Sequence, residues 1–160
     1  MRTILYLGST TDLDYERDLL REWGKQHAIH LASCVSLSQE QQLAATGTDG
    51  PVAASNQTQP DPLADVDAVV IERGTLGPDQ LRAHRDRLTC IVILDDTNAR
   101  VDVATATECC IWVTRATNRC AFSKLPFVTS TPGHAARRHA LQDALAGIAG
   151  ERPSGRVNEL

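Results

Sequence analysis

The chain has 160 residues, a length that suits a single domain with its own apolar core. Its formal charge of -4 argues against a nucleic-acid partner, because phosphate binding needs clustered cations. No stretch approaches the roughly 18 apolar residues of a membrane span, and no signal peptide precedes the first predicted strand, so we expect a cytoplasmic protein without a membrane segment.

The first half of the chain predicts two strands around one helix. Residues 3–9 form a β-rich apolar run that ends near Gly8, and residues 12–24 have apolar side chains at helical spacing. A second short strand is predicted over 28–35. Residues 45–62 are rich in Gly, Pro, Ser, Asn and Gln and lack any periodicity, so we expect a flexible insertion there.

The second half alternates buried strands with helices. The predicted strands are 67–72, 89–94 and 111–114, with a weaker sixth at 127–130, and the predicted helices are 77–88, 102–110 and 133–150. This alternation predicts a single flavodoxin-like α/β domain over residues 1–150, with a doubly wound parallel sheet of five or six strands and a C-terminal helix. Residues 151–160 form a polar tail that we expect to be frayed.

The cysteines and histidines predict no metal site. None of the five cysteines forms a Cys-x-x-Cys pair, and no histidine stands at metal-ligand spacing from two of them. Cys109 and Cys110 are adjacent, a pattern that can bind soft metals. A free cysteine more often packs as a small apolar residue, so we expect one to face the core and the other a helix end.

Polar residues follow each predicted central strand. Open parallel sheets bind ligands outside the carboxyl ends of their strands, so these residues are the candidate site. The candidate acid/base groups are Asp95 and Asp96, of which we expect only one to enter a pocket. Arg73 and Arg115 are candidate clamps for an anionic group. The remaining candidate ligand-binding residues are Ser9, Thr10, Glu72, Thr97 and Asn98.

The segment 64–120 resembles the substrate-binding domain of the NAD-dependent D-2-hydroxyacid dehydrogenases, most closely the branch that includes the C-terminal-binding-protein-like members. The moderately specific part of the pattern is "VD…ATE..I.V", formed here by Val101, Asp102, Ala106, Thr107, Glu108, Ile111 and Val113, with Arg100 before it. The segment "YERDLLREWG" fits the first helix of the same domain, so the resemblance spans roughly residues 1 to 120. It implies the same α/β fold for this chain.

Two departures from that family limit what can be transferred. The family's turn after the fourth strand is glycine-rich and holds the substrate carboxylate, whereas this chain has Asp95, Asp96 and Thr97 there. The family's nucleotide-binding domain, which supplies the phosphate loop and the catalytic residues, has no counterpart among these 160 residues. They contain no Gly-x-Gly-x-x-Gly motif, so we expect no nicotinamide cofactor and no hydride transfer by this chain alone.

These patterns leave two functional interpretations open, beside a third possibility of a degenerate remnant without a function. The first is a truncated homologue repurposed as a cofactor-independent tailoring enzyme, which performs acid/base isomerisation, cyclisation or elimination on a small metabolite in bacterial biosynthesis. The second is a non-catalytic protein that binds a small molecule or docks on a partner. Because the second domain is missing, the helix at 134–148, around Leu141, Leu145 and Ile148, is expected to expose apolar surface and to form a homodimer or a partner contact.

Overall fold

The computed structural model describes residues 1–9, 12–35, 61–95, 97–116 and 133–160. Its main feature is a five-stranded sheet in which every strand pair is parallel. The strands, in the order in which they lie side by side, are β2 (Ile29–Cys34), β1 (Arg2–Leu7), β3 (Ala68–Ile71), β5 (Cys90–Ile93) and β7 (Trp112–Arg115). Counted along the main sheet this order is 2-1-3-4-5, which confirms the predicted flavodoxin-like arrangement.

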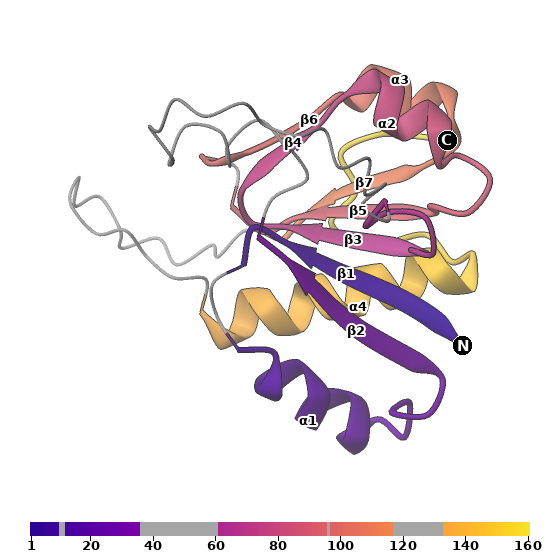
Figure 1. The fold of residues 1–160 in the computed structure, drawn as a ribbon. Helices are drawn as coiled ribbons and strands as arrows, with labels where there is room; N and C mark the ends of the chain where they lie inside the picture. The colour runs from indigo at the N-terminus through magenta and orange to yellow at the C-terminus, as the bar shows by residue number, and fades with distance from the viewer. Residues whose placement is uncertain (10–11, 36–60, 96, 117–132) are drawn as a thin grey trace, which may run out of the picture.

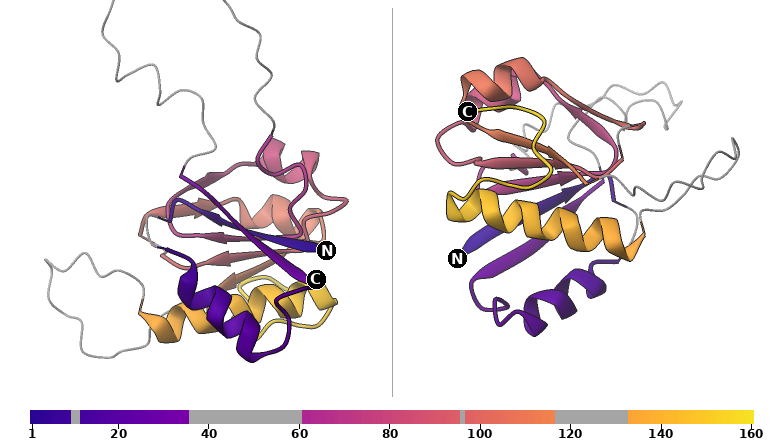
Figure 2. Two further views of the ribbon diagram at one scale, coloured as in Figure 1. Left: turned by 60° about the horizontal axis from the view of Figure 1, so that its bottom comes forward. Right: turned by 180° about the vertical axis from the view of Figure 1, so that it is seen from behind.

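The helices cover the sheet on both faces, as Figures 1 and 2 show. One face carries α1 (Asp14–Glu22) and the long α4 (His134–Ala149), and the other carries α2 (Pro78–Ala83) and α3 (Val103–Glu108). Side chains alternate between the two layers along each strand. In β3, for example, Val70 packs on the α1/α4 side and Ile71 on the α2/α3 side.

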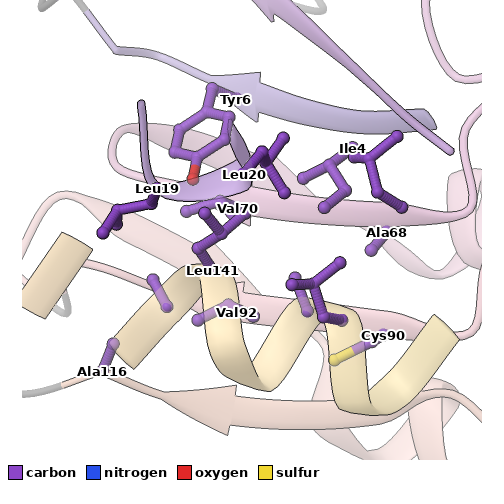
Figure 3. Packing of buried hydrophobic residues seen from close by; sticks show 14 of the residues in the cluster. Ile4, Tyr6, Leu19, Leu20, Ala68, Val70, Cys90, Val92, Ala116 and Leu141 are labelled. Carbon is purple, nitrogen blue, oxygen red and sulfur yellow. The ribbon is translucent and has the colours of Figure 1, made fainter. Parts of the chain in front are cut away.

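The apolar layer under α1 and α4 is drawn in Figure 3. Ile4, Tyr6, Val70, Val92 and Leu141 are all at most 1% exposed. Continuous burial of this kind explains why the central strands have almost unbroken apolar sequences, since both faces of a parallel sheet are covered. The phenol of Tyr6 points from β1 toward the helices (Figure 3).

Several elements differ from the prediction in their extent. The helix expected over 77–88 is α-helical only from Pro78 to Ala83. Two short strands that the sequence did not indicate, β4 (Gly74–Leu76) and β6 (Ala99–Val101), pair with each other in a second small sheet. A strand of three residues is too short to recognise from its sequence pattern. Each of these strands also depends on a partner about 25 positions away in the chain, as in the pair Gly74 and Ala99.

The apolar face of the closing helix is not exposed, contrary to the premise of the expected dimer. Leu141 and Leu145 are 0% and 8% exposed, and Ile148 packs against the same core layer. The helix lies against β3, β5 and β7, so its apolar face is buried against the sheet (Figure 1). A homodimer or partner complex through residues 134–148 stays a prediction. An exposed apolar surface on this helix no longer supports it, because that surface is buried in the core.

The polar tail 151–160 is docked instead of frayed. Asn158 is 6% exposed, and Thr114 and Arg156 form an antiparallel bridge between β7 and the tail. The prediction is wrong because polar composition does not reveal tertiary partners, and these polar groups bond to the outer edge of β7. The expected sixth strand at 127–130 and nearly all of the insertion at 45–62 lie outside the described residues.

Candidate functional site

The carboxyl ends of four strands, β1, β3, β5 and β7, bring the predicted residues to one edge of the sheet, which we call the rim. Ser9 follows β1, Glu72 and Arg73 follow β3, Asp95 follows β5, and Arg115 ends β7. These strands are parallel and adjacent, so their ends meet at the same edge (Figure 1). Thr10 and Asp96 are outside the described residues.

Glu72 is the buried carboxylate of the rim. It is 6% exposed, and its Oε2 atom has no hydrogen-bond partner. The backbone N–H of Glu72 donates to the carbonyl of Leu7 at 2.9 Å, so the pairing of β3 with β1 continues to this residue. Since Val70 faces α1 and α4, strand alternation places Glu72 on the same face. A carboxylate oxygen held there can accept a hydrogen bond or a proton from a ligand.

Asp95 has a different arrangement. Its Oδ1 accepts the backbone N–H of Thr97 at 2.9 Å, and its Oδ2 accepts the side-chain amide of Asn98 at 2.8 Å. Partial burial by itself raises the pKa of Asp95, but the hydrogen bonds from Asn98 and Thr97 outweigh it, and the pKa is lowered. With both oxygens engaged and the ionised form favoured, Asp95 holds its own turn together and is poorly suited to donate a proton near neutral pH.

The other rim residues differ in exposure. Arg73, Thr97, Asn98 and Arg115 are exposed, and Ser9 is buried. Arg115 also uses its backbone N–H to bond the carbonyl of Gly155 at 2.8 Å. The arginines can therefore meet an anionic group from solvent, while Ser9 and Glu72 lie deeper in the same rim.

Gly8 determines how closely the ends of β1 and β3 approach. Its φ is +74°, and a Cβ at this position would lie 2.2 Å from the carbonyl oxygen of Arg73. Glycine is required here for both reasons, because no side chain fits the contact and the left-handed backbone disfavours other residues. Gly8 thus places the backbone of Arg73 and Glu72 beside the loop that follows β1.

The structure adds polar groups behind the rim that sequence reasoning missed. Glu16 on α1 and Arg137 on α4 form a buried ion pair, in which Arg137 Nε donates to Glu16 Oε1 at 2.6 Å. Arg137 also donates to the carbonyl of Asp12, at the start of α1. The pair could have been noticed, because Glu16 and Arg137 each interrupt the apolar stripe of their own helix, with opposite charges.

Two further buried polar atoms share the α1/α4 face with Glu72. The Tyr6 hydroxyl and the Thr114 hydroxyl have no hydrogen-bond partner. Burial, and secondarily the charge of Glu16, raises the pKa of Tyr6, which keeps its phenol protonated, while Arg137 opposes this. Buried polar groups without partners are rare in folded proteins, so their concentration under one face marks the carboxyl half of this layer as unusual.

The similarity of this chain to known proteins is confined to solved structures. Neither a family model nor a curated protein sequence matches the chain. Similar solved structures include the D-lactate dehydrogenase of Escherichia coli, at 16% identity and a TM-score of 0.37. Others are an NAD-complexed D-isomer-specific 2-hydroxyacid dehydrogenase from Lactobacillus delbrueckii ssp. bulgaricus, at 9% and 0.43, and an NAD⁺-bound 3-phosphoglycerate dehydrogenase from Entamoeba histolytica, at 11% and 0.44.

These matches cover 71% to 72% of this chain. The chain spans only 30% to 33% of the length of those proteins. At such identities and TM-scores, the fold assignment rests on the strand order of this chain itself. The finer resemblance to the C-terminal-binding-protein-like branch is untested by them.

The described part of the chain contains neither a metal-binding cluster nor a membrane-spanning helix. No group of three or more His, Cys, Asp and Glu side chains there could hold a metal ion. None of the helices among these residues is long and apolar enough to span a bilayer. Cys109 packs partly against the α2/α3 core layer and Cys110 is exposed, as expected for a structural pair at a helix end.

Proposed function

We propose that the chain binds a small polar metabolite at the rim and moves a proton on it without a cofactor, with Glu72 as the acid/base group. The observation that supports this is the buried Glu72 carboxylate with an unpartnered oxygen at the edge where four strand ends meet. Leaving such an atom unpaired costs about 1–3 kcal/mol, a cost that a bound donor would remove. Isomerisation, cyclisation and elimination are the reactions that such a group can promote.

The rim offers complementary groups for an anionic substrate. Arg73 and Arg115 are exposed at the ends of β3 and β7, on either side of β5, and a guanidinium can hold a carboxylate through two parallel hydrogen bonds. Asp95 contributes through its turn, which fixes Thr97 and Asn98. This division replaces Asp95 by Glu72 as the proposed proton-transfer residue and keeps the arginines in the predicted role.

A non-catalytic binding protein is the second candidate. It is favoured by the state of Asp95, whose two oxygens are both occupied. Among the described rim residues this leaves Glu72 as the carboxylate with an oxygen open to a ligand. Binding needs no second proton-transfer group, whereas many proton relocations do. A cytoplasmic location and a partner complex are further proposals, which the fold neither requires nor opposes.

Nuclear magnetic resonance in D₂O tests the first proposal and separates it from the second. The probe is a panel of small metabolites that carry a carbonyl beside an exchangeable C–H, since a general base acts on such protons most readily. Saturation transfer reports binding, and loss of the C–H signal reports proton abstraction. Glu72→Gln is compared with wild type and with Glu22→Gln, an exposed glutamate at the end of α1 that serves as the control.

The outcomes are distinct. If wild type and Glu22→Gln exchange the proton and Glu72→Gln binds with at least about 100-fold slower exchange, Glu72 is the acid/base group. If wild type binds without exchange and Glu72→Gln binds more weakly, the protein is a binding module. If Glu72→Gln matches wild type in both measurements, the rim assignment is wrong. Calorimetric titration with NADH tests the expected lack of nicotinamide binding separately.

A further inference from the structure

Strand β7 is an edge strand of the main sheet. Its Trp112 N–H donates to Thr89 O, and the N–H of Ala116, just beyond the strand, donates to Ile93 O, both toward β5. Because successive groups of a strand alternate in direction, Val113 and Arg115 turn their N–H groups outward. An exposed edge with unpaired N–H and C=O groups is a template for pairing with another extended segment.

The C-terminal segment 154–158 occupies this edge in the chain itself. Arg115 N–H donates to Gly155 O at 2.8 Å, and Val157 N–H donates to Val113 O at 2.6 Å. The side chain of Asn158 completes the pairing by accepting the Val113 N–H at 2.8 Å and donating to Ile111 O at 2.9 Å. Figure 2 (right) shows the tail in yellow beside β7. Every outward backbone group named here has a partner in the tail.

The other end of the segment is anchored on α4. The buried carboxylate of Asp143 accepts the backbone N–H and hydroxyl of Ser154 and the backbone N–H of Gly155. The covalent connection between α4 and this anchored segment is short, residues 150–153. It begins at Gly150, whose φ of +75° ends the helix.

We propose that the outer edge of β7 is a self-association surface, and that the partner it takes is the segment 154–158 of a second copy of this chain, in a tail-exchanged dimer. Each contact that holds the tail in place would be reproduced between the two copies. Exchange of an identical element is a low-cost route to a dimer, because it requires new structure only in the hinge. The tail residues 151–160 carry two acidic and two basic side chains, so two copies do not repel each other through them.

The balance between the closed monomer and the exchanged dimer depends on the hinge. A short connection gives the chain's own tail an effective concentration in the millimolar range, so the closed form prevails when the protein is dilute. Removing two hinge residues shortens the reach by about 7 Å and prevents the tail from folding back onto its own edge. The tail of a second copy can then pair with the outer edge of β7.

The test is light scattering on full-length variants. Deletion of Glu151 and Arg152, which are both exposed, should convert the protein to a dimer at micromolar concentration. The matched control inserts Gly-Ser after Glu151 and should stay monomeric. In the shortened chain, Asn158→Ala should raise the dimer dissociation constant about 100-fold, since two exchanged tails each lose a contact worth about tenfold.

Three results would overturn the proposal. They are a shortened chain that melts cooperatively as a monomer, a dimer of the shortened chain that persists unchanged with Asn158→Ala, and equal dimer formation by the Gly-Ser control. If the shortened chain does not fold, Gly150→Ala decides. The added Cβ meets no atom within 4 Å, but alanine disfavours the left-handed backbone that ends α4, so the variant disfavours the turn that folds the tail back. Refolded at millimolar concentration, it should give a dimer in which the Val113 and Arg115 amides stay protected from hydrogen exchange. A monomer under these conditions would refute the exchange.

Discussion

Glu16 and Arg137 are two oppositely charged residues buried in the core layer under α1 and α4. Glu16 is 0% exposed, and both of its oxygens accept from Arg137. Burying two charges is costly, and their attraction compensates only when the geometry is good and the remaining donors are bonded. Here a third bond of Arg137, to the Asp12 carbonyl, adds to the pair and ties α4 to the residues just before α1.

Glu16→Gln should lower the free energy of unfolding by about 3–5 kcal/mol, because it leaves the Arg137 charge buried without its counter-charge. The double variant Glu16→Met/Arg137→Met should recover most of this loss, since well-packed apolar residues often replace a buried pair at little cost. Urea unfolding measures both. The control is Asp18→Asn, which breaks an exposed pair with Arg21 and should cost less than about 1 kcal/mol. A Glu16→Gln loss as small as the control would contradict the role of the pair.

Asp95 should contribute a part of the free energy of unfolding that is lost in acid. Its folded pKa is lowered, so its carboxylate stabilises the folded state above the unfolded pKa of about 4, and this contribution is lost as pH falls through the folded value. The site is partly solvated, so we expect Asp95→Asn to cost less than about 1 kcal/mol at pH 7. The difference from wild type should shrink between pH 5 and pH 2. A difference that is constant with pH in urea titrations would refute this assignment.

At the scale of elements, the close approach of the carboxyl ends of β1 and β3 depends on one residue. The β1 end approaches β3 so closely at Gly8 that the contact involves backbone atoms, which cannot move aside as a flexible side chain can. The same contact delivers Glu72 to the rim. The geometry of the candidate site is therefore coupled to the packing of two neighbouring strands.

Gly8→Ala should destabilise the protein by about 2–5 kcal/mol, from the left-handed backbone and the overlap with Arg73 together. Gly24→Ala is the matched control: its φ is +65°, but no atom lies within 4 Å of the added Cβ, so only the backbone cost of about 1–2 kcal/mol remains. Thermal or urea unfolding compares the two variants. Equal losses would mean that the close approach of β1 and β3 is relaxed in solution.

At the scale of the whole molecule, α4 closes one layer of the core. Gly147 lies directly over Cys90, since a Cβ on this glycine would be 2.3 Å from the Cys90 Cβ. Cys90 is 0% exposed, and its thiol contacts the Asp143 carbonyl. The helix that anchors the tail thus also seals the amino-terminal end of β5.

Cysteine labelling should report this closure. Burial, and then the charge of Asp143, raises the pKa of Cys90, so its reactive thiolate is scarce in the folded protein. Cys110 is exposed and should react with iodoacetamide at the rate of a free thiol. Site-resolved mass spectrometry should find Cys90 at least about 1,000-fold slower without urea, and labelled in step with global unfolding. Labelling of Cys90 at a rate close to that of Cys110 would show that α4 opens locally.

The sequence by itself determined the local elements and their alternation. The apolar runs that became β1, β3, β5 and β7 and the helical spacing of α1 and α4 are properties of neighbouring residues, so they can be recognised without the fold. The alternation also fixed the parallel sheet and the edge where Ser9, Glu72, Asp95 and Arg115 lie, because parallel strands end on the same side.

Only the tertiary structure decided which of these side chains already have hydrogen-bond partners within the chain and which keep an unpartnered polar atom. Asp95 and Glu72 are both acidic residues after strands, yet one is bonded within its own turn and the other is buried with a free oxygen. Glu16 meets Arg137 across 121 positions, and Asn158 meets Val113 across 45. Such contacts depend on how the crossovers place distant segments, and the tail's polar sequence predicted fraying because its partners, the free edge groups of β7, exist only once the sheet has formed.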